Sequence, residues 1–363
     1  ISDLGLSICQ HYNIRIGSIM IVMNIVENVS LRKHSAMRLG GETRFFAEAA
    51  SEDELKKLVD WAKEQVVPIV VIGEGSNIIW RDEGFSGLVI SNRITDRQVL
   101  DEDDNHMTIR VGAGEVWDSV VEWTVKKDLS GIEFLSAIPG LAGAAPIQNI
   151  GAYGAEISQS LVELSALDTH SDDFITIKNK ACGFGYRTSR FKTSDKGRFI
   201  ITSITLRLNK AGPAPPFYES LEAYFKKHKI KSYTPRTIRE AVIAIRAIKL
   251  PSPAKVANNG SFFTNPIIPK NEFAKLQQKY PDIKGWPHGD NVKVSAGWLL
   301  EEAGFKGVHD EETGMATWPA QALVLVNEHA NTTTDLLAFK QKIQTKIYQM
   351  FGIVLGQEPE LLP

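Results

Sequence analysis

The feature that most constrains this chain is a stretch of small residues, IPGLAGAAPIQNIGAYGAE, at residues 138–156. Its polar members are Gln148, Asn149 and Tyr153, and a segment so poor in bulky side chains cannot build a hydrophobic core by itself. Glycine lets a backbone approach a neighbouring group closely. The stretch is therefore either a close-packed loop with glycine turns or a surface against which a large flat ligand packs. A dinucleotide cofactor fits best, with amides facing its pyrophosphate.

A second glycine loop, GEGSN at residues 73–77, directly follows the apolar run PIVVIG at residues 68–73. The run predicts a buried strand. Successive amides in the loop, helped by Ser76 and Asn77, suit a phosphate, but a plain hairpin turn explains the sequence equally well. The loop is neither a Walker loop nor a Rossmann GxGxxG motif.

Composition narrows the class of protein. The chain has 363 residues, which suggests two or three domains, and a net charge of −2 argues against a general polyanion binder. Two cysteines, Cys9 and Cys182, form no disulfide framework, so a cytoplasmic location is expected. The histidines lack metal-ligand spacing, so we expect no metal. No apolar run is long enough to span a bilayer.

Hydrophobic periodicity predicts an α+β chain. Ser51 and Glu54 form a capping box before a helix to Gln65, and Thr234 and Pro235 begin a helix towards Lys249. Residues 210–217 are rich in Pro, Ala and Gly and predict a linker. Further helices are expected over 115–127, 269–280, 296–303 and 335–351, and strands over 107–114, 161–178, 198–208 and 322–328.

Three shorter motifs carry candidate chemistry. In GYRTSRFK, at residues 185–192, Arg187 suits an anionic group, whereas Arg190 and Lys192 are better explained by an exposed basic loop. Ser261 in NNGSFFTNP is either a turn cap or a hydroxyl in a partly desolvated pocket. Glu360 in QEPELL is either a functional carboxylate or, as the sequence alone favours, part of a solvated tail.

Taken in order, these motifs resemble the UDP-N-acetylenolpyruvoylglucosamine reductase family of bacterial cell-wall synthesis. VIGEGSN, PGLAGAAPIQNIGAYGAE, GYRTSRFK, RAIKLP, NNGSFFTNP, SAGWLLEEAGFKG and QALVLVN all match, and they span nearly the whole chain. The resemblance implies a two-lobed FAD-binding domain of the vanillyl-alcohol-oxidase and p-cresol-methylhydroxylase type, followed by a C-terminal α/β substrate-binding domain. The expected segments are a non-native or disordered extension at 1–22, the FAD domain at 23–212 (lobes 23–93 and 94–212), the substrate domain at 213–350, and a tail at 351–363 that returns to the flavin.

The resemblance also implies an oxidoreductase. NADPH would reduce non-covalently bound FAD, and reduced FAD would pass hydride to UDP-N-acetylglucosamine enolpyruvate, giving UDP-N-acetylmuramate for peptidoglycan. Ser261 matches the family's proton donor, while Arg187 and Glu360 match the pair that stabilises the enolate. The implied substrate-binding residues are Tyr186, Tyr218, Lys249, Asn265, Lys306 and Gln321. The implied cofactor-binding residues are Gly73, Gly75, Ser76, Asn77, Pro139, Gly140, Gly143, Ala144, Gln148, Asn149, Gly151, Ala152, Tyr153 and Gly154.

The chain departs from the family pattern at a few positions, such as Thr264 where lysine is common, which leaves the preference between NADPH and NADH open. Two other functions compete with the reductase. An oxidase of the same fold would commonly attach its flavin through His or Cys, and the glycine-rich loops contain neither. A non-catalytic sensor would lack one of Ser261, Arg187 and Glu360. We expect a monomer that binds neither nucleic acid nor membranes.

At the N-terminus, the apolar stretch from Ile16 to Val26 follows a single charge, Arg15, and lacks a small-residue cleavage site. An upstream extension before Met20 or Met23 therefore explains it better than a signal peptide.

Overall fold

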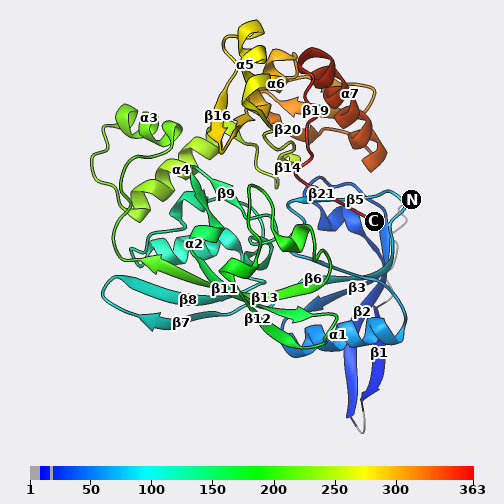
Figure 1. The fold of residues 1–363 in the computed structure, drawn as a ribbon. Helices are drawn as coiled ribbons and strands as arrows, with labels where there is room; N and C mark the ends of the chain where they lie inside the picture. The colour runs from blue at the N-terminus through cyan, green and yellow to red at the C-terminus, as the bar shows by residue number, and fades with distance from the viewer. Residues whose placement is uncertain (1–8, 17–18) are drawn as a thin grey trace. The chain divides into compact units, whose positions relative to one another are not determined.

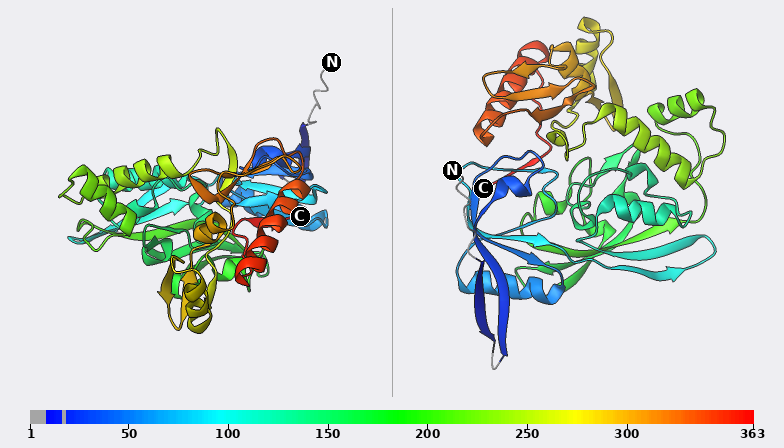
Figure 2. Two further views of the ribbon diagram at one scale, coloured as in Figure 1. Left: turned by 90° about the horizontal axis from the view of Figure 1, so that it is seen from above. Right: turned by 180° about the vertical axis from the view of Figure 1, so that it is seen from behind.

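The computed structural model describes residues 9–16 and 19–363 and groups them into two compact units (Figures 1 and 2). Unit 1 holds the described residues up to Val29, then Thr43–Glu74 and Phe85–Arg246. Unit 2 holds Ser30–Glu42, Gly75–Gly84 and Ala247–Pro363. Each unit is therefore assembled from separate stretches of the chain.

The first sheet of unit 1 has the order β1-β2-β3-β6-β4. Its strands are β1 (Cys9–Ile16), β2 (Ile19–Ser30), β3 (Glu42–Ala49), β6 (Phe85–Asn92) and β4 (Ile69–Ile72). β3 and β4 both pair in parallel with β6, and helix α1 (Glu52–Glu64) buries its apolar face against this sheet. The Ser51 hydroxyl accepts a hydrogen bond from the Glu54 amide, so the predicted helix start is confirmed.

The N-terminal extension expected at residues 1–22 falls partly outside the described residues, since residues 1–8 and 17–18 are not described. Within the described part, β1 and β2 form an antiparallel hairpin.

The second sheet of unit 1 is antiparallel, with the order β12-β11-β13-β8-β7. Its strands are β7 (Arg97–Glu102), β8 (His106–Gly112), β11 (Leu161–Asp168), β12 (Phe174–Lys178) and β13 (Phe199–Asn209), and Figure 2 shows these cyan and green strands side by side. Helix α2 (Trp117–Val125) packs on the core of this sheet, and a short pair, β9 (Gly151–Ala152) and β10 (Ala155–Glu156), lies in the glycine-rich loop. The strands predicted over 107–114, 161–178 and 198–208 are confirmed.

Two helices complete unit 1, α3 (Glu219–His228) and α4 (Pro235–Lys249, of which the part up to Arg246 falls in the unit). The Thr234 hydroxyl accepts from the Thr237 amide at 3.1 Å, which confirms the predicted start of α4. Leu221, Phe225 and Ile238 form a small core with Tyr153 of the glycine-rich loop. The sequence assigns these helices to the substrate-binding domain, and the structure packs them in unit 1.

Unit 2 is built around three small sheets with the orders β14-β20-β19-β18, β15-β17-β16 and β21-β5. Helices α5 (Lys270–Lys279), α6 (Ala296–Glu302) and α7 (Thr333–Phe351) confirm the helices predicted there, and Leu299 and Phe339 lie in their common core. The strands are β5 (Ile78–Trp80), β14 (Ala257–Ser261), β15 (Ile267–Pro269), β16 (Gly285–His288), β17 (Asn291–Val294), β18 (His309–Asp310), β19 (Met315–Trp318), β20 (Gln321–Asn327) and β21 (Glu360–Leu362).

Among the described residues, no helix is both long enough and apolar enough to cross a membrane.

Candidate active site

The first half of the glycine-rich loop is packed tightly against the end of β8 and the start of α2. The amides of Ala142 and Gly143 donate to the carbonyls of Glu115 and Ala113 at 2.8 and 2.9 Å. A Cβ atom on Gly143 would lie only 2.4 Å from the Cβ of Ala113. At Gly143, the close-packed interpretation of the sequence therefore explains the glycine.

The second half of the loop is open and held in a rarely populated backbone conformation. Asn149 and Tyr153 have φ of 50° and 51°, in the left-handed region that non-glycine residues seldom adopt. Gly154 follows with φ of 86°, and no atom lies within 4 Å of the place its Cβ would take. Such strain concentrates at ligand sites, where the surrounding structure holds it in place. This half has the form that the cofactor hypothesis requires.

Asn149 helps to hold that conformation. The side chain is fully buried, and its amide nitrogen donates to the Glu156 carboxylate at 2.7 Å and to the Gly185 carbonyl at 3.1 Å. Its oxygen accepts from the Ser158 amide at 3.2 Å. All of these partners belong to the protein, so the Asn149 side chain stabilises the conformation of the loop.

Arg187 is brought to the loop by a tight turn. Gly185 and Thr188 exchange backbone hydrogen bonds of 3.0 and 3.2 Å, and Arg187 between them has φ of 54°. Its Nη2 donates to the carbonyl of Gly151 at 2.6 Å, and its Cζ lies 5.3 Å from the centre of the Tyr186 ring. The structure thus places the predicted arginine and tyrosine beside the loop.

Arg190 has a structural role. Its Nε donates to the Asp195 carboxylate at 2.7 Å, and its Cζ lies 5.2 Å from the centre of the Phe199 ring. The exposed basic loop favoured by the sequence is therefore replaced here by a partly buried ion pair.

Tyr218, predicted to bind substrate, precedes α3 and packs edge-on against Tyr153, with 6.0 Å between ring centres. Arg246, a residue that the sequence analysis missed, interacts electrostatically with Tyr153 from α4. Burial lowers the pKa of this guanidinium, and Asp118 also interacts with it electrostatically, but no described residue forms a hydrogen bond or a close ion pair with it. Burial likewise raises the pKa of the Tyr153 phenol. The signal was present in RAIKLP, where Arg246 lies one helical turn before Lys249.

A partly buried ion pair supports the start of the loop. Arg239 of α4 donates to both carboxylate oxygens of Asp118, at 2.6 and 2.9 Å, and Asp118 also accepts from the Ala137 amide at 2.6 Å. Burial alone would raise the pKa of Asp118, but these donors hold it below its ordinary value. Helices α2 and α4 are thereby joined to the residue before Ile138.

In unit 2, a β-bulge positions Ser261. Strand β14 pairs with β20 through Asn258 and Val326, and then through Ser261 and Val324, with one extra residue on β14. The Asn258 side chain accepts from the amide of Gly260 at 2.9 Å, and Gly260 has φ of 72°. Bulges re-aim side chains next to active sites. Buried Phe262 and Phe263 follow the half-buried serine in the chain.

The C-terminal tail runs beside this bulge. The amide of Glu358 donates to the carbonyl of Phe262 at 2.8 Å, and Glu360 then pairs in parallel with Ile78 of β5 (Figure 1). The Glu360 amide also donates to the carbonyl of Asn77 at 3.0 Å. Ser261 and Glu360 therefore share one neighbourhood with the second glycine loop. The solvated tail that the sequence favoured for Glu360 is replaced by an ordered strand.

The second glycine loop is held closely at Gly75. This residue has φ of 69°, and its Cβ would lie 2.1 Å from the carbonyl oxygen of His34. Both the conformation and the space therefore require glycine. Gly73 lies in unit 1, whereas Gly75, Ser76 and Asn77 lie in unit 2, so the loop passes from one unit to the other.

The remaining predicted substrate contacts all lie in unit 2. Asn265 accepts from the Ala296 amide at 2.9 Å, and the Gln321 side chain lies beside Gly297, so both meet at the start of α6. Lys306 forms an ion pair with Glu301 at 3.1 Å, and Lys249 is exposed at the end of α4.

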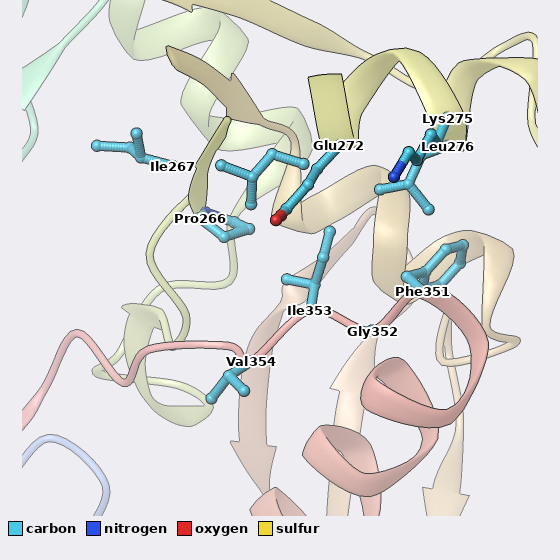
Figure 3. A pocket seen from close by; sticks show the side chains of 10 residues that line it. Pro266, Ile267, Glu272, Lys275, Leu276, Phe351, Gly352, Ile353 and Val354 are labelled. Atoms are coloured by element: carbon cyan, nitrogen blue, oxygen red, sulfur yellow. The ribbon is translucent and has the colours of Figure 1, made fainter. Parts of the chain in front are cut away.

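A pocket of about 580 Å³ lies elsewhere in unit 2, between α5, β15 and the chain that leaves α7 (Figure 3). None of the residues predicted for the site lines it. Its lining residues are Pro266, Ile267, Ile268, Glu272, Lys275, Leu276, Phe351, Gly352, Ile353 and Val354.

Comparisons with known proteins agree with this architecture. The family described as "FAD binding domain" matches residues 43–171, and "UDP-N-acetylenolpyruvoylglucosamine reductase, C-terminal domain" matches residues 252–362. The predicted fold class, oxidoreductase class and FAD cofactor are thereby confirmed.

Similar whole proteins carry the same family name. A UDP-N-acetylenolpyruvoylglucosamine reductase of Alcanivorax borkumensis is 38% identical, over 93% of this chain and 96% of the relative. One of Pseudomonas aeruginosa is 35% identical, over 93% of this chain and 99% of the relative. The crystal structure of the Thermus caldophilus enzyme has a TM-score of 0.66 at 22% identity, covering 94% of this chain and 100% of that one. The chain therefore belongs to the UDP-N-acetylenolpyruvoylglucosamine reductase family.

Proposed function

We propose that this chain uses NADPH and FAD to reduce UDP-N-acetylglucosamine enolpyruvate to UDP-N-acetylmuramate, in the synthesis of peptidoglycan precursors. The observation that carries the proposal is the shared neighbourhood of Ser261 and Glu360. The tail contacts Phe262 through Glu358 and then reaches Asn77 and Ile78 through Glu360. The backbone segments that carry this hydroxyl and this carboxylate thus lie beside a loop suited to a phosphate.

The described residues fit FAD as the resident group. Gly154 leaves open space beside a strained backbone, and Gly75 holds the second glycine loop in a tight turn with φ of 69°. When bound, FAD supplies hydride transfer from NADPH to the enolpyruvyl group. Residues 73–77 and 139–154 would hold it, with the polar contacts expected from Ser76, Asn77 and Gln148.

The chain's own residues then control charge and proton. Addition of hydride to the terminal carbon of the enolpyruvyl group builds negative charge beside its carboxylate, as an enolate. Arg187 would stabilise that charge, because a guanidinium offers paired donors to a carboxylate. Ser261 would donate a proton to the adjacent carbon, and Glu360 would complete the group.

The remaining predicted residues would bind the sugar nucleotide. Tyr218, with Tyr153 and Arg246 beside it, suits the diphosphate, because Arg246 is a half-buried cation that forms no ion pair with a described carboxylate. Lys249 would add a second positive charge, with Tyr186 near the flavin. Asn265, Lys306 and Gln321 would contact the remainder of the substrate. We further propose that the enzyme is a monomer and that it works in a reducing cytosol.

The proposal is tested with purified protein. We expect a yellow protein whose absorption near the flavin band bleaches with NADPH and returns when the enolpyruvyl sugar nucleotide is added. Steady oxidation of NADPH should require that nucleotide. NADPH oxidation that proceeds at full rate with oxygen alone would instead indicate an oxidase, and absence of bound flavin would refute the proposal.

A further inference from the structure

Asn259 links the strand that carries Ser261 to the second glycine loop. Its side chain is 8% exposed. Its Nδ2 donates to the carbonyl of Ser76 at 2.9 Å and to the carbonyl of Ile78 at 3.2 Å. Carbonyl oxygens only accept hydrogen bonds, so the amide must turn its nitrogen towards them. The orientation of the side chain is therefore set by its partners.

The other end of the amide has no partner. Asn259 Oδ1 is fully buried, and among the described residues no group donates a hydrogen bond to it. A buried acceptor that stays unpaired is costly and rare in folded proteins. Asn149 offers a contrast, since its oxygen and nitrogen are all bonded to protein groups. The oxygen of Asn259 can thus accept a hydrogen bond that no described residue supplies.

The position of this oxygen limits which groups can donate a hydrogen bond to it. Asn259 lies in the bulge two residues before Ser261, and its nitrogen is bonded to Ser76 within the loop proposed to hold the cofactor. Phosphate oxygens cannot satisfy it, because they are themselves acceptors. The donor is therefore an O–H or N–H group, which a molecule bound against this loop can supply.

We propose that Asn259 is a ligand-binding residue, whose Oδ1 accepts a hydrogen bond from an O–H or N–H donor of the bound cofactor or substrate. The inference rests on the proposed function, because it places a ligand against residues 75–77. FAD is the first candidate, since Asn259 is tied to Ser76. The hydroxyl and amide groups of the sugar nucleotide offer the same chemistry, and the experiment separates the two sources.

The first test is the affinity of the apoprotein for FAD, measured by quenching of flavin fluorescence. A neutral hydrogen bond contributes about 0.5–1.5 kcal/mol, so Asn259→Ala should weaken binding by about two- to tenfold. If the donor belongs to the substrate, the KM for the enolpyruvyl nucleotide should rise by that factor instead. Asn327→Ala is the matched control, because Asn327 also lies in unit 2 and donates to the Met37 carbonyl at 3.2 Å. It should change neither quantity.

The second test observes the amide directly in the unmutated protein, and it remains valid if the variant fails to fold. Asparagine labelled with ¹³C at Cγ gives one resonance for each side chain, and Asn259 is assigned by its absence in Asn259→Ala or Asn259→Asp. Asn258 serves as internal reference, because its oxygen already accepts from Gly260.

We expect the Asn259 resonance to move when FAD is added, or when the sugar nucleotide is added to the holoenzyme, while that of Asn258 stays. If FAD binds and neither ligand moves the Asn259 resonance, water satisfies the oxygen and the inference is overturned while the proposed function stands. Failure of the unmutated protein to bind FAD would overturn both.

Discussion

The glycine-rich loop yields the sharpest prediction, because the structure separates two reasons for its glycines. Gly143 is glycine for packing: a Cβ there would lie 2.4 Å from the Cβ of Ala113 and 3.0 Å from its Cα. Ala113 is itself held by hydrogen bonds to Gly143 and Thr202 of 2.9 Å each, so it cannot move aside cheaply. Overpacking of this kind costs about 3 kcal/mol, so Gly143→Ala should lower the stability of the fold.

Gly154 is glycine for a different reason. Its φ of 86° disfavours alanine by about 1 kcal/mol, but a Cβ there meets no atom within 4 Å. Gly197 is the matched control, because its φ is 78° and its Cβ also meets nothing within 4 Å. Both variants should lose the same small amount of stability. Only Gly154→Ala should impair the cofactor, because its methyl group would take up space that the flavin needs.

The assay combines urea unfolding of the apoproteins with titration of FAD. We expect Gly154→Ala to raise the Kd for FAD about tenfold or more, equivalent to about 1.4 kcal/mol, and Gly197→Ala to leave it unchanged. Equal affinity in the unmutated protein, Gly154→Ala and Gly197→Ala would show that the open half of the loop does not contact the cofactor. The proposal that this half of the loop forms part of the FAD-binding site would then be refuted.

Two further predictions concern ion pairs of unit 1. The paired hydrogen bonds from Arg198 to Asp168 lower the pKa of Asp168 from 3.8 to about 2, so this carboxylate stabilises the fold above its ordinary pKa and loses that effect as pH falls towards 2. The stability advantage of the unmutated protein over Asp168→Asn, measured by urea unfolding, should therefore shrink between pH 4 and pH 2, and a constant difference would contradict the assignment. Asp118→Ala should cost about 2 kcal/mol of stability, because it strands Arg239, whose side chain is only 13% exposed, while the partial exposure of Asp118 moderates the loss. A calorimetric unfolding midpoint equal to that of the unmutated protein would contradict a stabilising role for the Arg239–Asp118 ion pair.

Local signals in the sequence predicted local structure well. Ser51 and Thr234 have the side chains that cap helices, and both helices begin there. The strand at 69–72 follows from its continuous β-branched run, but the prediction that it is buried holds only for Ile72, because β4 lies at the edge of its sheet. These features depend on residues close together in the chain, which is why periodicity and capping chemistry find them.

Long-range features could not be predicted in this way. No local pattern indicates that residues 30–42 and 75–84 join unit 2, or that Arg190 pairs with Asp195 in place of an exposed loop. Glu360 looks like tail sequence by itself, and only its pairing with Ile78 orders it. The Asn259 oxygen lacks a partner because the side-chain nitrogen faces the carbonyls of Ser76 and Ile78, and the local sequence does not reveal those contacts.

The central claim is that Ser261, Glu360 and Arg187 act together on the substrate after the flavin is reduced. Stopped-flow spectroscopy tests it most directly by following the two half-reactions separately. In Ser261→Ala, reduction by NADPH should keep its rate, whereas reoxidation by the enolpyruvyl nucleotide should slow by at least about a hundredfold, the usual contribution of a positioned proton donor. Reoxidation at the unmutated rate, with reduction intact, would contradict the account.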